Sequence, residues 1–479
     1  MARPRFMLIT YPAMGHINPT LQFAKRLAAA TEADITFAIQ LSAYRHMSKG
    51  SDEAMKDIET ANGSLISFAP FSVDGFDDTF GMGSQKTVQN LISETARCGT
   101  QAITDLVVSA RDDGRPYSLL VYTLLLPWAG VTADKLRLPS AMLWIQPAMV
   151  FAIYYHYFYG SGDIIRELCA KGDYNSSKTT LPGLSLELTR RDLPSIMDPE
   201  DTYYVALRSF EEEFEMIETR NQRRILVNSF DKLETEALRA VPGLSLIGVG
   251  PLIPLVFLDD KSPFENKSKD KYIDWLNSKP KATVVYVSFG TLWLPPKQQL
   301  EEIAKGLLDF GRPFLWVIRE RTQNDEKGDD DGELSCREEL DKLGMIVPWS
   351  SQVEVLCNES IGCFVSHCGW NSTLETLASG VPVVAIPRRS DQWTSAKLIG
   401  DVWKTGVRVK SNKNEIVPSD EIKRCLELVM GENGEENGVE IRRNAKKWKD
   451  LAREAPKEGG SSDKNIKALV AEMIQGTQV

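Results

Sequence analysis

The chain has 479 residues, which is too many for one hydrophobic core, so we expect two domains. Its apolar fraction of 42% and charged fraction of 25% are those of an ordinary globular protein. The net charge of −10 argues against a nucleic acid or an anionic membrane surface as a partner.

Cysteine content and the N-terminal sequence indicate the compartment. The seven cysteines form no C-x-x-C pair, which is typical of reduced thiols. The first twelve residues hold only about five consecutive apolar residues, too few for a signal peptide. No run approaches the roughly 20 apolar residues of a membrane span. We therefore expect a cytoplasmic protein.

Short apolar runs alternate with longer amphipathic segments, which predicts α/β architecture with parallel sheets. Pro19 is expected to begin the first helix, with Asn18 as its N-cap. A later helix is predicted over 371–379, closed by Gly380. The predicted strands are 6–10, 35–39, 119–122, 141–145, 284–289, 314–318, 345–347, 363–366 and 383–386.

The alternation of strands and helices occurs in both halves of the chain, so we expect two Rossmann-like domains. Three prolines followed by a charged, Ser/Lys-rich run mark the boundary. Ligands of such sheets bind at the carboxyl ends of the strands. The expected division is an N-terminal domain, an interdomain linker, a C-terminal domain and a tail, at 1–249, 250–271, 272–455 and 456–479.

Segment 349–392 contains the most informative pattern, because it combines an aromatic residue, a strand–turn–helix unit and an Asp-Gln pair. The turn before helix 371–379 would point backbone N–H groups outward and form an anion site. Two structural alternatives remain open. Ser372 and Glu375 also fit a capping box, and Trp349 could be a core tryptophan.

Over its 44 residues, segment 349–392 resembles the signature box of plant family 1 UDP-dependent glycosyltransferases. The resemblance extends across nearly the whole chain. It implies the GT-B fold, in which two Rossmann-like domains with parallel sheets face a cleft and the tail packs on the N-terminal domain. It also implies inverting, UDP-glucose-dependent O-glucosyl transfer to a small plant metabolite, without a metal or another cofactor.

The resemblance also assigns roles within the sugar-donor site. It places His367 on the diphosphate, Trp349 on the uracil ring and Glu375 on the ribose hydroxyls, since a carboxylate offers two acceptor oxygens to a diol. Gln392 is expected to contact the sugar and favours glucose. The implied donor-binding residues are Ser288, Gly290, Thr291, Trp349, Gln352, His367, Trp370, Asn371, Ser372, Glu375, Asp391 and Gln392.

In the N-terminal half, His16 lies in the segment YPAMGHINP and matches the family's catalytic histidine. A neutral imidazole could accept the proton of an acceptor hydroxyl. Thr123 stands where most members carry an aspartate that pairs with this histidine. Three explanations are open: another acid substitutes, Thr123 orients the ring, or the acceptor ionises easily. The Thr form resembles the subgroup with anthocyanin 5-O-glucosyltransferases and crocetin glucosyltransferases, which form glucosyl esters.

Four other sequence features give weaker information about function. Arg389 and Trp393 depart from the signature box, and Arg389 is expected to face solvent. The aromatic run 154–159 either lines an acceptor pocket or belongs to the core. The acidic runs 211–213 and 329–331 are expected to be solvated, so no metal site is predicted. We expect a monomer. The rival functions are a nucleotide-sugar epimerase and a non-catalytic UDP-sugar-binding protein.

Overall fold

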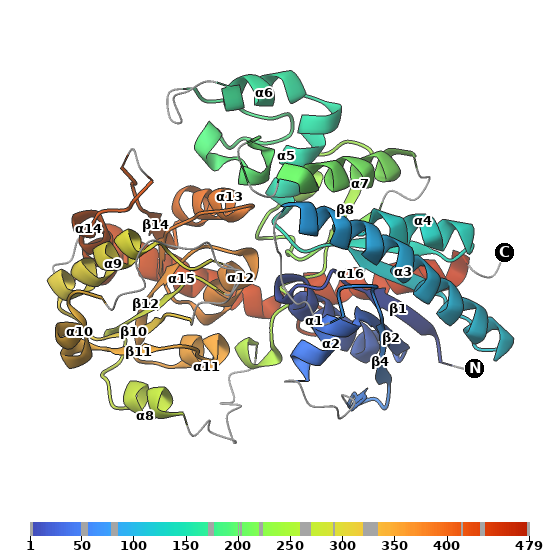
Figure 1. Ribbon diagram of the computed structural model, residues 1–479, viewed down its shortest axis with the longest axis horizontal. Coiled ribbons are helices and arrows are strands. Elements are labelled where there is room, and N and C mark those ends of the chain that lie inside the picture. Colours follow the sequence, from blue (N-terminus) through green and yellow to red (C-terminus); the bar gives the residue numbers. More distant parts are fainter. Residues whose placement is uncertain are drawn as a thin grey trace. The chain divides into compact units, whose positions relative to one another are not determined.

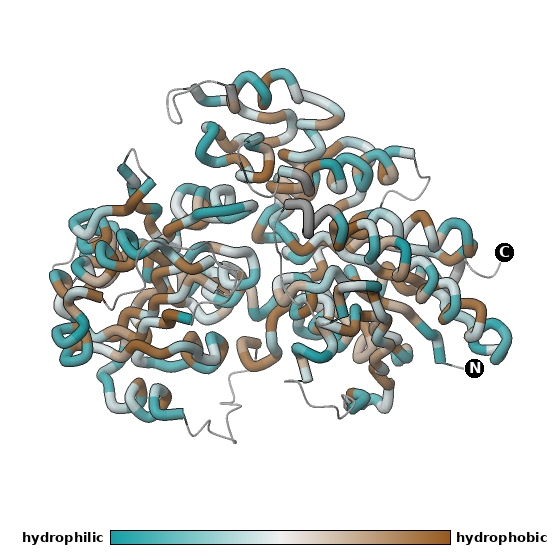
Figure 2. Tube along the Cα trace, in the orientation of Figure 1, coloured by the Kyte–Doolittle hydropathy of each residue, from teal (hydrophilic) through white to brown (hydrophobic). Residues whose placement is uncertain are grey.

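The computed structural model describes residues 3–48, 56–77, 85–170, 177–199, 201, 204–219, 224–258, 270–290, 293–319, 334–412, 415–431 and 436–476. The chain divides into two compact units. The first unit comprises Met1–Ile253 and Ala455–Val479, and the second comprises Pro254–Glu454. In both units the apolar segments coincide with the strands and the inner helix faces (Figure 2).

The first unit is built on an eight-stranded sheet with the order β3-β4-β2-β1-β5-β6-β7-β8. Every neighbouring pair is parallel except β3 and β4, which are antiparallel (Figure 1). The strands are β1 Arg5–Ile9, β2 Asp34–Gln40, β3 Ile58–Glu59, β4 Leu65–Phe71, β5 Leu119–Thr123, β6 Ser140–Trp144, β7 Arg224–Val227 and β8 Ser245–Gly248. The α-helices are α1 Met14–Thr31, α2 Leu41–Met47, α3 Gln85–Asp112, α4 Pro127–Lys135, α5 Ala148–Tyr159, α6 Gly162–Ala170, α7 Leu207–Thr219 and α16 Ser461–Gly476.

The second unit has a six-stranded, fully parallel sheet with the order β11-β10-β9-β12-β13-β14. The strands are β9 Val284–Ser288, β10 Phe314–Val317, β11 Met345–Val347, β12 Ile361–Ser366, β13 Val383–Ala385 and β14 Gly406–Arg408. The helices are α8 Lys271–Asn277, α9 Lys297–Phe310, α10 Arg337–Leu343, α11 Gln352–Cys357, α12 Trp370–Ser379, α13 Gln392–Lys397, α14 Ser419–Met430 and α15 Glu436–Glu454, and the π-helical turn Leu398–Val402 follows α13.

The predicted α/β class with two Rossmann-like sheets is confirmed, and all nine predicted strands are present within one or two residues. The C-terminal helix α16 belongs to the first unit, where Ser462 donates a hydrogen bond to the Gly250 carbonyl. Asn465 Nδ2 donates to the Gly248 carbonyl at 2.8 Å. These contacts tie the last segment of the chain to strand β8 and the residues that follow it.

The expected start of the first helix was wrong. Helix α1 begins at Met14, with Ala13 as its N-cap, and Pro19 lies inside it. A proline there removes one intrahelical hydrogen bond, which a helix tolerates near its start. His16 is therefore a helical residue of the first turn and not a loop residue.

The predicted solvent exposure of the acidic run 211–213 is only partly correct. Glu211 and Glu212 are exposed on α7, but Glu213 is 1% exposed. The reason is helical periodicity, because Glu213 shares the buried face with Phe210 and Phe214. The acidic run 329–331 lies outside the described residues. All seven cysteines are free thiols, and none of the described helices has the length and apolar character needed to cross a membrane.

Candidate functional site

Several of the predicted residues follow the strands between which strand order reverses in each sheet. The second sheet begins in the middle at β9, continues to β10 and β11 on one side and then to β12 on the other. Ser288 and Ser366, the last residues of β9 and β12, are partners in register. The first sheet reverses in the same way between β1 and β5. Open α/β sheets bind ligands at this switch point, so each unit offers one candidate site.

Helix α12 begins after a glycine N-cap. Gly369 has no side chain that could cap the first turn, and the Trp370 backbone N–H donates a hydrogen bond to the Asp391 carboxylate. The capping-box alternative was wrong, because Ser372 Oγ accepts a hydrogen bond from Gln352 Nε2 at 2.9 Å instead. Asn371 lies half-buried in the same turn. The backbone N–H groups and the positive helix end can therefore serve an anion such as a diphosphate.

Gly369 is a candidate site residue that the sequence analysis missed. A glycine immediately before a helix that begins with Trp-Asn-Ser is a usable signal, because a glycine N-cap puts no side chain over the first turn. A Cβ atom at this position would also lie 2.7 Å from His367 Nε2.

Glu375 lies one turn into α12 and is half-buried. Gln352, the first residue of α11, donates a hydrogen bond to its carboxylate. Burial raises the pKa of Glu375 to about 7, and the bond from Gln352 opposes this rise. Gln352 and Glu375 thus lie together although 22 residues separate them in the chain, and near neutral pH the carboxyl group is partly protonated.

Trp349 is 64% exposed in the loop between β11 and α11. The alternative of a core tryptophan is therefore wrong. An indole ring exposed to solvent is free to stack on a flat base.

His367 follows β12 and is enclosed by two glycines. Gly290 has φ +73°, and a Cβ atom built there would lie 3.0 Å from Cε1 and Nε2 of His367. Burial lowers the pKa of His367 to about 4, and a hydrogen bond to the Ser288 backbone opposes this effect. Its Nδ1 is buried without a hydrogen-bond partner among the described residues. His367 is thus a neutral ring whose N–H donates to Ser288 and whose Nδ1 can only accept a hydrogen bond. Thr291 lies outside the described residues.

Asp391 is 8% exposed and lies beside α12. Burial raises its pKa to about 6, while hydrogen bonds from its own backbone, the Ser390 side chain and the Trp370 backbone oppose this rise. One oxygen, Oδ2, is buried and accepts no hydrogen bond from the described residues. The Trp370 ring itself is buried, with its centroid 6.0 Å from that of Trp403. Trp370 therefore contributes its backbone, and Asp391 keeps an acceptor for a hydroxyl group.

Gln392 begins α13, and its side-chain carbonyl is already used. Its Oε1 accepts hydrogen bonds from the backbone N–H groups of Arg388 and Arg389, at 2.9 and 3.0 Å. This pairing directs the amide nitrogen away from the loop. Arg389, expected in solvent, is half-buried, as is Trp393. The structure thus shows Gln392 held by its own loop, with its NH₂ group left as the end that can contact a sugar.

His16 occupies the switch point of the first unit. Its Nδ1 is buried and has no hydrogen-bond partner among the described residues, and its ring centroid lies 5.1 Å from that of Tyr11. Burial lowers the pKa of His16 to about 3. The first turn of a helix also disfavours positive charge. The imidazole is therefore neutral over the physiological range.

Thr123, the last residue of β5, is fully buried. Its Oγ1 accepts a hydrogen bond from the Tyr11 backbone N–H at 3.1 Å. This contact fixes the loop that leads to His16, but the hydroxyl makes no bond to the His16 ring in the described structure. Of the three explanations for the missing aspartate, direct orientation of the ring by Thr123 therefore loses its support.

The aromatic run in α5 divides between core and surface. Tyr154 is fully buried and stacks on Phe210, with ring centroids 4.7 Å apart, whereas Tyr159 is 43% exposed. The start of α5 is fixed by buried Glu234, whose two carboxylate oxygens accept the backbone N–H groups of Ala148 and Met149 at 3.0 Å each. The sequence analysis missed Glu234, since no local pattern links it to a helix 86 residues away.

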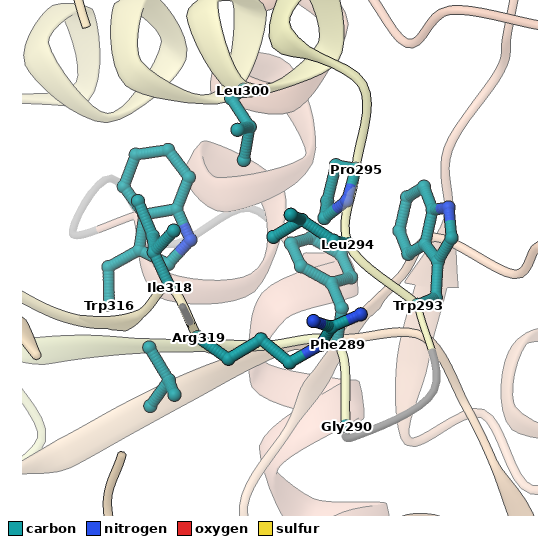
Figure 3. A pocket seen from close by; sticks show the side chains of 10 residues that line it. Phe289, Gly290, Trp293, Leu294, Pro295, Leu300, Trp316, Ile318 and Arg319 are labelled. Atoms are coloured by element: carbon teal, nitrogen blue, oxygen red, sulfur yellow. The ribbon is translucent and has the colours of Figure 1, made fainter. Parts of the chain in front are cut away.

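Two other features were considered as binding sites. A small cavity of about 10 Å³ lies beside Gly290, between Trp293, Trp316 and Arg319 (Figure 3), and has room for about one water molecule. Among the described residues, one group of metal-type ligands, Asp74, Glu94 and Cys98, lies within 4.8 Å. Arg97 already forms ion pairs with both of these carboxylates. Neither feature offers a cofactor site.

Known proteins share this architecture over the full chain. A family model for UDP-glucoronosyl and UDP-glucosyl transferase matches residues 251–444. The chain is 54% identical to phloretin 4'-O-glucosyltransferase of Malus domestica, over 98% of each chain. It is 49% identical to a chloroplastic crocetin glucosyltransferase of Gardenia jasminoides, over 98% of each. Among solved structures, Os79 of O. sativa in complex with UDP gives a TM-score of 0.79 at 32% identity, covering 98% of this chain and 100% of that one.

Proposed function

The chain belongs to the plant UDP-glycosyltransferase family, and we propose that it transfers glucose from UDP-glucose to an oxygen atom of a small plant metabolite, with inversion at the anomeric carbon. The observation that carries this proposal is the glycine-capped amino terminus of α12. It lies in one unit with an exposed indole, a half-buried carboxylate and a buried acceptor oxygen on Asp391. These are the groups that a diphosphate, a base, a diol and a sugar require.

In the proposed sugar-donor site, Trp349 stacks on uracil and Glu375 accepts hydrogen bonds from the ribose hydroxyls. Asn371 and Ser372 bind the diphosphate at the helix end, with the neutral His367 ring beside it, and the helix dipole offsets the charge of the departing UDP. The negative chain can bind this anion because the helix end supplies local N–H groups without lysine or arginine. Asp391 Oδ2 and the NH₂ group of Gln392 hold the glucose hydroxyls.

In the proposed reaction, His16 accepts the proton of the acceptor hydroxyl. The oxygen forms a bond to the anomeric carbon from the face opposite the diphosphate, and the bond from that carbon to the UDP oxygen breaks. UDP leaves with the electron pair. A neutral imidazole suits the role of base, but a half-buried ring whose Nδ1 has no carboxylate partner among the described residues gives little stabilisation to the imidazolium that forms.

We propose that the acceptor is therefore an acidic hydroxyl or a carboxylic acid. A carboxyl group with a pKa of about 4–5 is already ionised near neutral pH and needs no base. An acidic phenol needs little assistance from a base to lose its proton. The names of the relatives, phloretin 4'-O-glucosyltransferase and crocetin glucosyltransferase, are consistent with small metabolites of this kind.

The proposal is tested by calorimetry with UDP and UDP-glucose, followed by an assay of acceptors with UDP-glucose and mass spectrometry. The acceptors should include flavonoids, anthocyanins, hormones and carboxylic polyenes. We expect binding of UDP and a mass increase of one hexose on at least one acidic acceptor. A reaction with UDP-glucose alone that yields an epimer would contradict the proposal, as would no measurable binding of UDP.

A further inference from the structure

Two buried tyrosines fix the loop that carries Trp349. The loop connects β11 to α11 and holds Trp349 and Gln352 only three residues apart. Trp349 is 64% exposed, so packing of its own side chain does little to hold it. Ser350 and Ser351 between them make hydrogen bonds to phenol groups from two other elements.

Tyr272 belongs to α8 and is 5% exposed. Its hydroxyl oxygen accepts a hydrogen bond from the Ser351 backbone N–H at 3.0 Å. The same hydroxyl is bonded to the Asp270 carboxylate. Because a phenol has one proton, that proton goes to Asp270 and a lone pair is directed at Ser351. The contact therefore specifies where the backbone immediately after Trp349 lies.

Tyr286 belongs to β9 and is 1% exposed. Its hydroxyl lies 3.1 Å from Ser350 Oγ, and it also bonds the Ser288 side chain. The ring stacks on Phe364 of β12 with centroids 4.7 Å apart. This side chain thus connects the end of β9, at the switch point of the sheet, to the residue next to Trp349.

We propose that Tyr272 is a positioning residue for the base-binding platform, with Tyr286 as the second anchor. This inference rests on the proposed function, in which Trp349 stacks on uracil. Neither phenol touches the nucleotide. Each holds the loop in its bound geometry before the nucleotide arrives, so that less conformational entropy is lost on binding. Ser351 also caps α11, since its Oγ accepts from Glu354 N at 3.5 Å, so the same anchor sets the start of the helix that carries Gln352.

The test is Tyr272→Phe in the full-length enzyme, which removes one hydroxyl and keeps the ring. We expect the Kd for UDP and the KM for UDP-glucose to rise about three- to tenfold, the range for one lost hydrogen bond. The kcat and the KM for the acceptor should stay within about twofold of wild type. Ser350→Ala, which removes the partner of Tyr286, should act in the same direction.

A control variant and a double-mutant cycle separate positioning from stability. Tyr117→Phe removes another buried phenol, bonded to Thr36 Oγ1 at 2.9 Å in the first unit, and should lower Tm without changing the Kd for UDP. In a Trp349→Ala background, Tyr272→Phe should raise the Kd for UDP by less than about a further twofold, because the indole that the loop positions is already absent. Fully additive effects, or an unchanged Kd in Tyr272→Phe, would overturn the inference. Absence of UDP binding by the wild type would instead reject the proposed function.

Discussion

Protonation of Glu375 should control the affinity for the sugar donor. Burial raises its pKa to about 7, so the carboxyl is about half ionised at pH 7 in the ligand-free protein. Only the ionised form offers all its lone pairs to the ribose hydroxyls. Binding should therefore favour the carboxylate and release a proton.

The size of the effect follows from this pKa. If only the carboxylate binds, the apparent Kd is multiplied by 1 + 10^(pKa − pH), which is about 11 at pH 6 and about 1.1 at pH 8. Affinity should thus rise about tenfold between these values and level off above about pH 8. Asp391, with a pKa raised to about 6, should add up to about twofold at the acid end.

The assay is isothermal titration calorimetry with UDP-glucose at several pH values. UDP itself is unsuitable because a terminal phosphate titrates near pH 6. Two buffers of different ionisation enthalpy should show release of about half a proton per site at pH 7. In Glu375→Gln the affinity should be lower at pH 8 and nearly independent of pH above 6.5, whereas Asp391→Asn should retain the dependence around pH 7. A Kd that is constant from pH 6 to 8 in the wild type would refute the reasoning.

Further predictions concern stability, the glycine beside His367 and the base. The folded-state pKa of Glu375 lies above its usual value of 4.5, so its contribution to the unfolding free energy is fully present below about pH 4.5. That contribution is lost as pH rises through about 7, by at most about 3 kcal/mol. Thermal unfolding of the ligand-free wild type and of Glu375→Gln at several pH values measures this loss, and an equal pH slope in both proteins would contradict it. Gly290→Ala should weaken UDP binding at least tenfold by displacing His367. Gly311→Ala is the control, because Gly311 has φ +72° and its nearest neighbour at 3.9 Å, so this variant should lose only about 1–2 kcal/mol of folding stability through left-handed backbone strain. An equal loss of UDP affinity in both variants would exclude the displacement. His16→Ala should lower kcat on a neutral hydroxyl acceptor by about 10²–10⁴, and turnover near that of the wild type would remove His16 from the reaction. Thr123→Asp should raise turnover on weakly acidic acceptors more than on carboxylic acids, with Thr123→Asn as the uncharged control; equal gains on both classes would exclude the ionisation argument.

Most of the strands that sequence analysis predicted are buried on both faces; the edge strand β11, whose three residues are half-buried, is the exception. Strands β1, β5, β9 and β12 appear in the sequence as continuous apolar runs, because helices cover both sides of a parallel sheet. Strand β4 lacks this signal. It contains Pro70 and is mostly half-exposed, and β7 and β14 are only four and three residues long. Such strands form because a neighbouring strand offers them hydrogen-bonding partners, which no local pattern records. Strands β11 and β13 also have only three residues each, but their apolar residues made them predictable.

Sequence alone determined the α/β class and the two Rossmann-like sheets, because apolar periodicity and turn residues act over a few neighbouring residues. Segment 349–392 stood out as a candidate sugar-donor site through its resemblance to the family's signature box. Tertiary structure decided the state of each group in the candidate sites. Gln352 forms hydrogen bonds to Ser372 and Glu375, and the Thr123 hydroxyl accepts one from the Tyr11 backbone. Gly290 lies close to the His367 ring, and the Tyr272 hydroxyl accepts a hydrogen bond from the Ser351 backbone. Those contacts join residues from 20 to 112 positions apart. Burial and hydrogen bonding between such distant residues, which set pKa values and exposure, exist only once the sheet has assembled.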